Sequence, residues 1–247
     1  MRKVNFQDLG KIDYKEAWDY QQLLLKKVIE TKVSNRKLVK QDPSFCCPKN
    51  YLLFCEHPPV YTLGKSGSFE HLLLNEQQLI AKNIQFYKIN RGGDITFHGP
   101  GQVVGYPIFD LDQFFTDVHK YVRYLEEVVI RTLSDYGVLG TRIKGFTGVW
   151  LEGEVGQPNR KICAIGVHLS RWVTMHGFAF NVNTDLDYFN YIIPCGINDS
   201  DKAVTSMSKE LGKFVDIIEV KERLKFHFSS LFEFDWVNRE STEEIRN

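Results

Sequence analysis

The segment that decides the fold reads Arg91-Gly92-Gly93-Asp94-Ile95-Thr96-Phe97-His98-Gly99-Pro100-Gly101-Gln102-Val103-Val104-Gly105-Tyr106. Five glycines and one proline interrupt a pattern that otherwise predicts two short strands. Glycine lets a backbone approach a ligand closely and tolerates positive φ. A structural hairpin needs one turn glycine, whereas here two glycine clusters flank Arg91 and His98. We therefore interpret the segment as the wall of a ligand site, with an ordinary glycine-rich turn as the alternative.

The functional groups of this segment are a guanidinium and an imidazole. Arg91 offers a fixed fork of donors, and His98 is of the one side-chain type whose unperturbed pKa lies near neutrality. The segment is not a phosphate-binding loop, because it has neither the G-x-G-x-x-G pattern nor a Gly-Lys-Ser/Thr ending. Gly64-Lys65-Ser66-Gly67 resembles such an ending but lacks the upstream glycine. The sequence therefore disfavours a nucleotide loop.

The composition is that of an ordinary globular protein. The chain has 247 residues, of which 43% are hydrophobic and 25% charged, and its formal net charge is zero. Zero net charge predicts no strong attraction to nucleic acid or to an anionic membrane. No stretch has the roughly 18 uninterrupted apolar residues of a membrane helix, and residues 1–8 resemble neither a signal nor a transit peptide. A cytoplasmic location is expected.

The five cysteines do not form a recognisable framework. They are Cys46, Cys47, Cys55, Cys163 and Cys195. An odd count without framework spacing argues against a disulfide scaffold and for a reducing compartment. There is no C-x-x-C or H-E-x-x-H motif and the histidines are scattered, so no metal site and no cofactor are predicted.

Periodicity and capping signals predict a single α+β domain over residues 1–247. A helix is expected from Asp13 to about Glu30, then a surface connection over 31–50. The final helix is expected after Asp216, with Ile218, Leu224, Phe228 and Leu231 on its apolar face, and 237–247 form a tail. The other expected elements are strands at 51–55, 60–63, 84–89 and 149–151, a helix capped by Asn75, a helix from Thr116 to Gly137 and a hairpin of 160–169 with 173–182.

Cys195 is a candidate nucleophile. It stands in Ile193-Pro194-Cys195-Gly196-Ile197, where the proline fixes the local geometry and the glycine leaves space for an approaching group. A buried turn cysteine is the alternative. Cys163 and Cys55 lie in apolar strand patterns and are expected to be core residues.

A nucleophilic cysteine needs an activator, because a thiol at its ordinary pKa is mostly protonated at neutral pH. The candidates are one of the histidines His98, His168 and His176, or a lysine that stabilises the thiolate. Lys161 begins the strand pattern Lys161-Ile162-Cys163-Ala164-Ile165-Gly166. The pattern alone does not select Lys161 over Lys144, and each candidate taken singly also suits a purely structural role.

Taken together, these residues resemble the lipoyl(octanoyl) transferase family. Residues 91–106 are similar to its R-G-G-x-x-T-[aromatic]-H-x-x-G-Q-x-x-x-Y signature. The resemblance covers most of residues 10 to 230 and also includes 56–64, Gly148-Val149-Trp150, 161–166, His176 to Asn183 and Pro194-Cys195-Gly196.

The resemblance implies a cysteine/lysine acyltransferase on the catalytic-domain fold shared with lipoate and biotin protein ligases. Cys195 would accept octanoyl as a thioester, and Lys161 would lower the pKa of the thiol and move its proton. The residues implied to line the octanoyl pocket are Arg91, Gly92, Gly93, Asp94, Ile95, Thr96, Phe97, His98, Ala164, Ile165, Gly166, Gly177, Phe178 and Ala179.

The implied donor is octanoyl-acyl carrier protein. The implied acceptors are the lipoyl domains of 2-oxoacid dehydrogenase complexes and the glycine cleavage H protein. Neutral charge and a single domain are compatible with a monomer. Two rival interpretations remain open from the sequence: an ATP-dependent lipoate-protein ligase on the same fold, and a non-catalytic protein that binds acyl groups or lipoyl domains.

Overall fold

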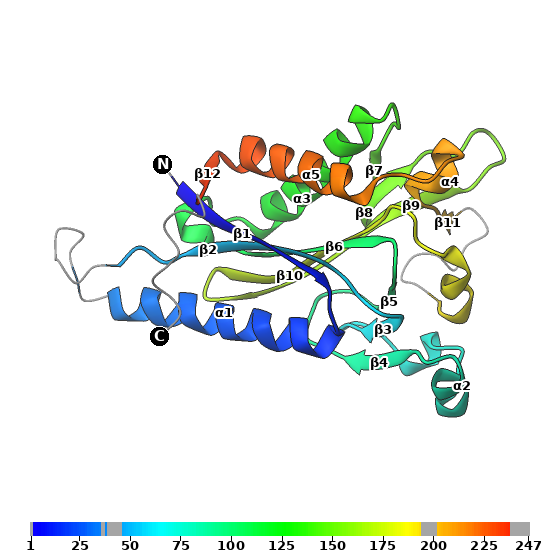
Figure 1. Ribbon diagram of the computed structural model, residues 1–247, viewed down its shortest axis with the longest axis horizontal. Helices are drawn as coiled ribbons and strands as arrows, with labels where there is room; N and C mark the ends of the chain where they lie inside the picture. The colour runs from blue at the N-terminus through cyan, green and yellow to red at the C-terminus, as the bar shows by residue number, and fades with distance from the viewer. Residues whose placement is uncertain (1, 36–37, 39–45, 194–201, 238–247) are drawn as a thin grey trace.

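Figure 1 shows the computed structural model of the chain, which describes residues 2–35, 38, 46–193 and 202–237. The core is a nine-stranded sheet in the order β12-β1-β2-β6-β10-β9-β8-β7, with β11 beside β9. A three-stranded sheet in the order β4-β3-β5 stands next to it. The strands are β1 Arg2–Lys11, β2 Asn50–Glu56, β3 Val60–Leu63, β4 Gln85–Lys88, β5 Ile95–His98, β6 Gln102–Ile108, β7 Thr141–Ile143, β8 Phe146–Leu151, β9 Asn159–Ser170, β10 Val173–Asn181, β11 Lys202–Val204 and β12 Phe234–Trp236.

The helices cover both faces of the large sheet. The α-helices are α1 Tyr14–Ser34, α2 Glu76–Ala81, α3 Val118–Asp135, α4 Met207–Leu211 and α5 Ile217–Phe232, and short 3-10 turns occupy Phe69–His71, Leu111–Gln113 and Leu186–Tyr191. Helix α1 packs on β6 and β10 from one side, and α3 with α5 covers the other (Figure 1). No helix within the described residues is long and apolar enough to cross a membrane. The expected α+β domain is confirmed.

The glycine-rich segment joins the two sheets. Its first strand, β5, pairs with β3 in the small sheet, and its second, β6, pairs with β2 and β10 in the large one. The two expected short strands are confirmed, and the tight Gly99–Gly101 connection carries the chain from one sheet to the other. Gly101 has a φ of +79°, a left-handed value that glycine adopts without strain.

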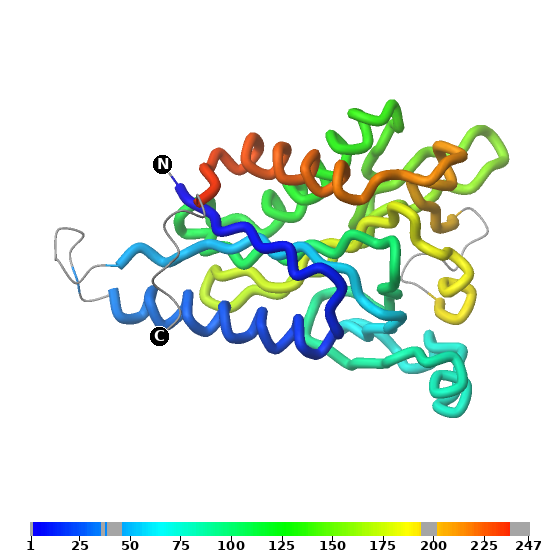
Figure 2. Tube along the Cα trace, viewed as in Figure 1, coloured from blue at the N-terminus to red at the C-terminus, as the bar shows by residue number. Residues whose placement is uncertain are grey.

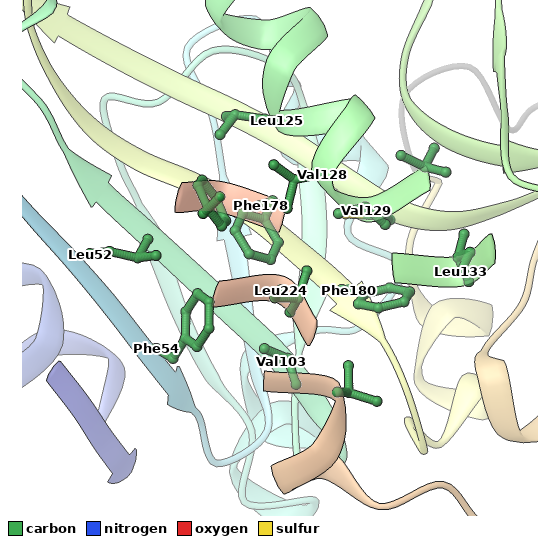
Figure 3. Close-up of a cluster of buried hydrophobic side chains, with 14 of the residues drawn as sticks. Leu52, Phe54, Val103, Leu125, Val128, Val129, Leu133, Phe178, Phe180 and Leu224 are labelled. Carbon is green, nitrogen blue, oxygen red and sulfur yellow. The ribbon is translucent and has the colours of Figure 1, made fainter. Parts of the chain in front are cut away.

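The larger hydrophobic core lies between the sheet and helices α3 and α5. Figure 3 shows its centre, where Phe178 and Phe180 from β10 meet Leu125 and Val129 from α3 and Leu224 from α5. A second core lies under α1, whose Ala17, Leu24 and Val28 are buried as their spacing predicts. Cys163 belongs to the first core and Cys55 to the second, as expected.

The expected hairpin is confirmed in detail. Val173 pairs with Ser170, and the two turn residues Arg171 and Trp172 have φ values of 52° and 64°. Two successive positive φ angles match the right-handed twist of the flanking strands. The expected strands at 51–55 and 60–63 are present, with β3 at the expected bounds and β2 one residue longer at each end.

Several sequence expectations need correction. Helix α1 continues to Ser34, beyond the expected end at Glu30, so the surface connection is shorter than 31–50. The helix expected from Thr116 begins at Val118, with Asp117 as its N-cap. Ile218, expected on the apolar face of the last helix, is 73% exposed. Helix α5 buries the face that carries Val220, Leu224 and Phe228. Ile218 lies some 200° around the helix from Val220 and therefore faces away from the core. The tail beyond Val237 lies outside the described residues.

Strand β1 was not expected from the sequence. Of its ten residues only Val4 is buried, so it lacks the alternation that identifies a strand. It pairs in parallel with β2 on one side and with β12 on the other, and this long-range pairing holds it in place.

The small sheet and α2 form a lobe at the lower right of Figure 2. Residues 71–73 hold the chain that leads to Ile193: Leu72 forms a bridge with Ile192, the amide of Leu73 donates to Tyr191 O (2.9 Å), and that of Ile193 donates to His71 O (2.8 Å). This lobe therefore positions the described chain just before Cys195.

Two phenylalanines of α5 test the assignment of its buried face. Phe228 is fully buried and Phe226 is 64% exposed. Phe228→Ala should lower the free energy of unfolding by about 3–5 kcal/mol, because it removes an aromatic ring from a close-packed core. Phe226→Ala is the matched control and should change it by less than about 0.5 kcal/mol. Urea denaturation of both variants measures the difference; equal losses would show that the helix face is assigned wrongly.

Candidate active site

A cavity of about 350 Å³ opens where the two sheets meet. This volume lies within the range of about 300–1,000 Å³ typical of small-molecule sites. The cavity brings together three segments that are far apart in the sequence: the glycine-rich segment, β9 and β10. The sequence-predicted residues in its wall are Arg91, Gly92, Gly93, Asp94, Ile95, Thr96, His98, Lys161, Ala164, Ile165, Gly166, Gly177, Phe178 and Ala179.

Phe97 is the one predicted lining residue that the structure places elsewhere. Its ring is buried and stacks on Tyr188 with a centroid distance of 4.6 Å. Side chains alternate along a strand, so Phe97 points away from the face of β5 that carries Thr96 and His98. Phe97 therefore supports the cavity wall from behind.

Glycine allows β9 to lie directly against the glycine-rich segment. The amide of Gly92 donates to Val167 O at 2.9 Å, and a Cβ atom on Gly166 would lie 2.8 Å from Gly92 O. Real Cβ atoms essentially never come that close to an oxygen, so Gly166 is required by the approach itself.

Arg91 is a structural donor as well as a wall residue. It is 8% exposed, and its Nη2 atom donates to the carbonyl oxygen of Thr62 at 2.6 Å and to the Thr62 hydroxyl at 3.1 Å. Its Nη1 atom donates to Gly92 O at 3.0 Å. Arg91 therefore fixes the loop that carries it to the small sheet.

The histidines near the cavity are weak bases. Burial lowers the pKa of His98 well below its usual value, and the positive charge of Arg91 adds to the effect. Burial likewise lowers the pKa of His176 to about 3. Burial and the nearby Lys65 lower the pKa of His168, which lies outside the cavity wall. Neutral imidazoles of such low basicity are poorly suited to take a proton from a thiol.

Lys161 reaches the cavity from β9. Its side chain is partly buried, and its Nζ atom lies 4.6 Å from the centroid of the Trp150 ring, a cation–π distance. Lys144, which the sequence could not separate from it, is exposed and is not part of the wall. The structure thus distinguishes the two lysines.

Cys195 lies outside the described residues, so its side chain is not placed relative to Lys161. The chain is described up to Ile193 and again from Lys202, which pairs with Asn159 at the start of β9. Val204, two residues later, pairs with Lys161 and lines the cavity.

His176, a candidate activator from the sequence, also lies in the wall. The wall residues that were not singled out from the sequence are Tyr14, Gln102, Val104, Tyr106, Val122, Gly145, Phe146, Thr147, Val167, Asn181, Phe189 and Val204. Gln102, Tyr106, His176 and Asn181 stand in segments that carry the family resemblance, so that signal was available. Tyr14 opens α1 and stacks on His98 with a centroid distance of 5.8 Å. Nothing in the local sequence pattern marks it as a wall residue.

The sequence of the chain matches a family of known proteins. Residues 13–229 match the family described as the lipoyl protein ligase A/B catalytic domain. A protein named octanoyltransferase from Christiangramia forsetii is 59% identical over 94% of this chain and 97% of its own length. Another with that name, from Cytophaga hutchinsonii, is 55% identical over 98% of this chain and 97% of its own.

Solved structures share the fold at low sequence identity. A bipartite lipoate protein ligase from Thermoplasma acidophilum aligns over 97% of this chain and 89% of its own, with a TM-score of 0.65 and 17% identity. A lipoate-protein ligase A bound with ATP aligns over 97% of this chain and 90% of its own, with a TM-score of 0.63 and 16% identity. These matches confirm the expected ligase-type catalytic fold.

The buried histidines predict how stability depends on pH. Burial lowers the pKa of His57 to about 4 and that of His176 to about 3. The unfolded chain binds protons on these groups below pH 6.5 while the folded state does not, so stability is lost as the pH falls through 6.5. Each of these two histidines should lower the free energy of unfolding by about 2 kcal/mol when the pH falls from 7 to 5.

Urea denaturation at pH 7 and pH 5 measures this effect. His57→Gln should reduce the difference between the two pH values, and His119→Gln, at an exposed position, should leave it unchanged. An unchanged difference in His57→Gln would show that the pKa of His57 is not lowered in the folded state.

Proposed function

The chain belongs to the lipoyl protein ligase A/B catalytic-domain family, and from this membership we propose that it is an octanoyltransferase. It moves an octanoyl group from octanoyl-acyl carrier protein to a lysine of an apo lipoyl domain, the first step of endogenous protein lipoylation. The observation that carries the proposal is identity of 55–59% over nearly the full length to proteins of that name.

The transfer proceeds in two steps through Cys195. The Cys195 thiolate attacks the thioester carbonyl of the donor, the carrier protein leaves as its thiol, and octanoyl remains as a thioester on Cys195. The acceptor lysine amine then attacks this thioester, forms an amide and releases the cysteine thiol. A covalent intermediate of this kind predicts ping-pong kinetics.

Lys161 supplies the proton chemistry of both steps. In the first step its ammonium stabilises the thiolate of Cys195 and gives a proton to the departing carrier-protein thiolate. In the second step the neutral amine left on Lys161 takes the proton that the acceptor amine loses, which restores the ammonium beside the released Cys195 sulfur. Support for the lysine comes from its position in the cavity wall and from the low basicity of the nearby histidines. A lysine near a thiol lowers the thiol pKa and raises the fraction of reactive thiolate.

The energetics need no nucleotide. Exchange of one thioester for another is nearly balanced, and formation of an amide from a thioester is downhill. ATP activation is the feature of the rival interpretation, a lipoate-protein ligase. The solved ligases share the fold, but their identity of 16–17% leaves the reaction undecided, whereas the relatives above 50% identity carry the transferase name.

The cavity suits a short acyl chain. Its walls include apolar side chains such as Ile165, Phe178 and Ala179, and its volume is about 350 Å³. Each methylene that leaves water contributes roughly 0.8 kcal/mol, so a saturated chain gains its affinity along the wall. In this proposal the acceptors are the lipoyl domains of 2-oxoacid dehydrogenase complexes and the glycine cleavage H protein. The enzyme works in the cytoplasm as a monomer and needs no cofactor.

The nucleophile can be identified by intact-protein mass spectrometry. Incubation with octanoyl-acyl carrier protein without ATP should add one octanoyl group to Cys195, labile to hydroxylamine and discharged by apo lipoyl domain. Cys195→Ser should give no such thioester and no turnover, while Cys46→Ser, at an exposed cysteine, should behave as wild type. Labelling only with ATP and free octanoic acid would assign the protein to the ligases, and turnover by Cys195→Ser would exclude this nucleophile.

The two lysines near the cavity form a matched pair. Lys161→Ala should slow acylation by about 10²–10⁴-fold, the usual contribution of a proton-transfer group, and shift its pH dependence upward. Lys144→Ala should keep the wild-type rate, because Lys144 is exposed and outside the wall. Pre-steady-state acylation rates from pH 6 to pH 10 test this; an unchanged pH profile in Lys161→Ala removes the lysine from the mechanism.

A further inference from the structure

A row of buried polar side chains crosses the cavity wall from the small sheet to β11. Its members are at most 8% exposed: Arg91, Thr62, His98, Gln102, Asn181 and Thr205. A polar group removed from water is costly unless it is hydrogen-bonded. Each of these residues is therefore placed by the bonds that it makes to the next.

The amide of Gln102 has only one possible orientation. Its Nε2 atom lies 3.1 Å from the carbonyl oxygen of Phe97, which can only accept, and 2.9 Å from Oδ1 of Asn181. Both amide hydrogens are thus used, and Oε1 faces Nδ1 of His98 at 2.9 Å. Nδ1 must then carry the hydrogen of the neutral imidazole.

Asn181 is oriented by the same logic. Its Nδ2 atom donates to the carbonyl oxygen of Thr205 at 3.0 Å, and its Oδ1 atom accepts from Gln102. The bonds from His98 through Gln102 and Asn181 to Thr205 therefore all run in one direction. Hydrogen bonds arranged in series polarise one another, so the row is stiffer than its separate pairs.

Both ends of the row reach groups of the candidate site. The amide of Thr205 donates to the carbonyl oxygen of Lys161 at 2.9 Å, next to the pairing of Val204 with Lys161. At the other end Thr62 accepts from Arg91 with its hydroxyl oxygen, which leaves the hydroxyl hydrogen for Nε2 of His98 at 3.4 Å. The row thus connects Arg91 to the backbone of Lys161.

We infer that Gln102 and Asn181 are positioning residues, which hold Thr205 and the backbone of Lys161 in register with the Arg91–His98 wall of the cavity. This inference rests on the octanoyl transfer proposed above and adds residues to it. Asn181 acts through Thr205 and not through the reacting atoms. A displacement of about 1 Å at a reacting group can cost on the order of 100-fold in rate, so loosening the row should lower kcat.

Asn181→Asp tests the inference with a minimal change. The carboxylate has nearly the shape of the amide and keeps an acceptor for Gln102, but it cannot donate to Thr205 O. Asn183→Asp is the matched control: Asn183 donates to Val215 O at 2.8 Å and accepts from the Val215 amide at 3.0 Å, outside the cavity wall. The same donor is lost in both variants.

Asn181→Asp should lower kcat for octanoyl transfer at least about tenfold, with KM for octanoyl-acyl carrier protein within about twofold of wild type. Asn183→Asp should keep both constants within about twofold. Hydrogen exchange at the Thr205 amide, which is bonded to Lys161 O, should accelerate in Asn181→Asp only. Asn181→Ala, which is uncharged, should show the same changes and replaces Asn181→Asp if the carboxylate prevents folding.

The outcomes separate the two proposals. Wild-type protein that transfers no octanoyl overturns the proposed function. If the wild type transfers octanoyl, two results overturn the positioning role alone. One is a fully active Asn181→Asp variant, and the other is an equal loss of kcat in Asn183→Asp. Unchanged Thr205 exchange in both Asn181 variants would show that Asn181 does not hold Thr205, whatever the activity.

Discussion

The contact between the ring of Phe178 and the backbone of Gly105 is the constraint on which both the core and the cavity depend. The two residues are paired across β10 and β6, and a Cβ atom on Gly105 would lie 2.1 Å from the ring. The ring can take this place only because Gly105 has no side chain. From there it stacks on Phe228 of α5 at 5.8 Å and also lines the cavity. One side chain thus links helix packing to the shape of the site.

The site is built by backbones that approach closely and by polar groups that are buried in pairs. Gly166 lets β9 meet the loop at Gly92, which places Lys161 and Arg91 in one wall. Such an approach excludes water from the peptide groups, so every buried donor there needs a partner. The bonds of Arg91 to Thr62 and of Asn181 to Thr205 meet this need and at the same time define where the wall residues stand.

Local patterns predicted what depends on neighbours in the sequence. The hairpin at Arg171, the caps at Asn75 and Asp216 and the buried stripe of α1 all follow from short-range chemistry. The patterns did not predict β1, whose pairing is long-range, or the support role of Phe97, which depends on the direction of β5. The wall positions of Lys161 and Tyr14 depend likewise on contacts between distant segments.

The pairing of β1 with β12 has a consequence for how the protein is made. Arg2, Lys3 and Val4 lie in register with Phe234, Asp235 and Trp236. Strand β1 can therefore pair with β12 only after residues 234–236 have been synthesised. A ribosome adds about 5–20 residues per second, and the edge of β1 therefore stays open for many seconds during synthesis of the 247 residues. An open edge can pair with other chains. The edge of β1 at these three positions is covered only when β12 pairs with it.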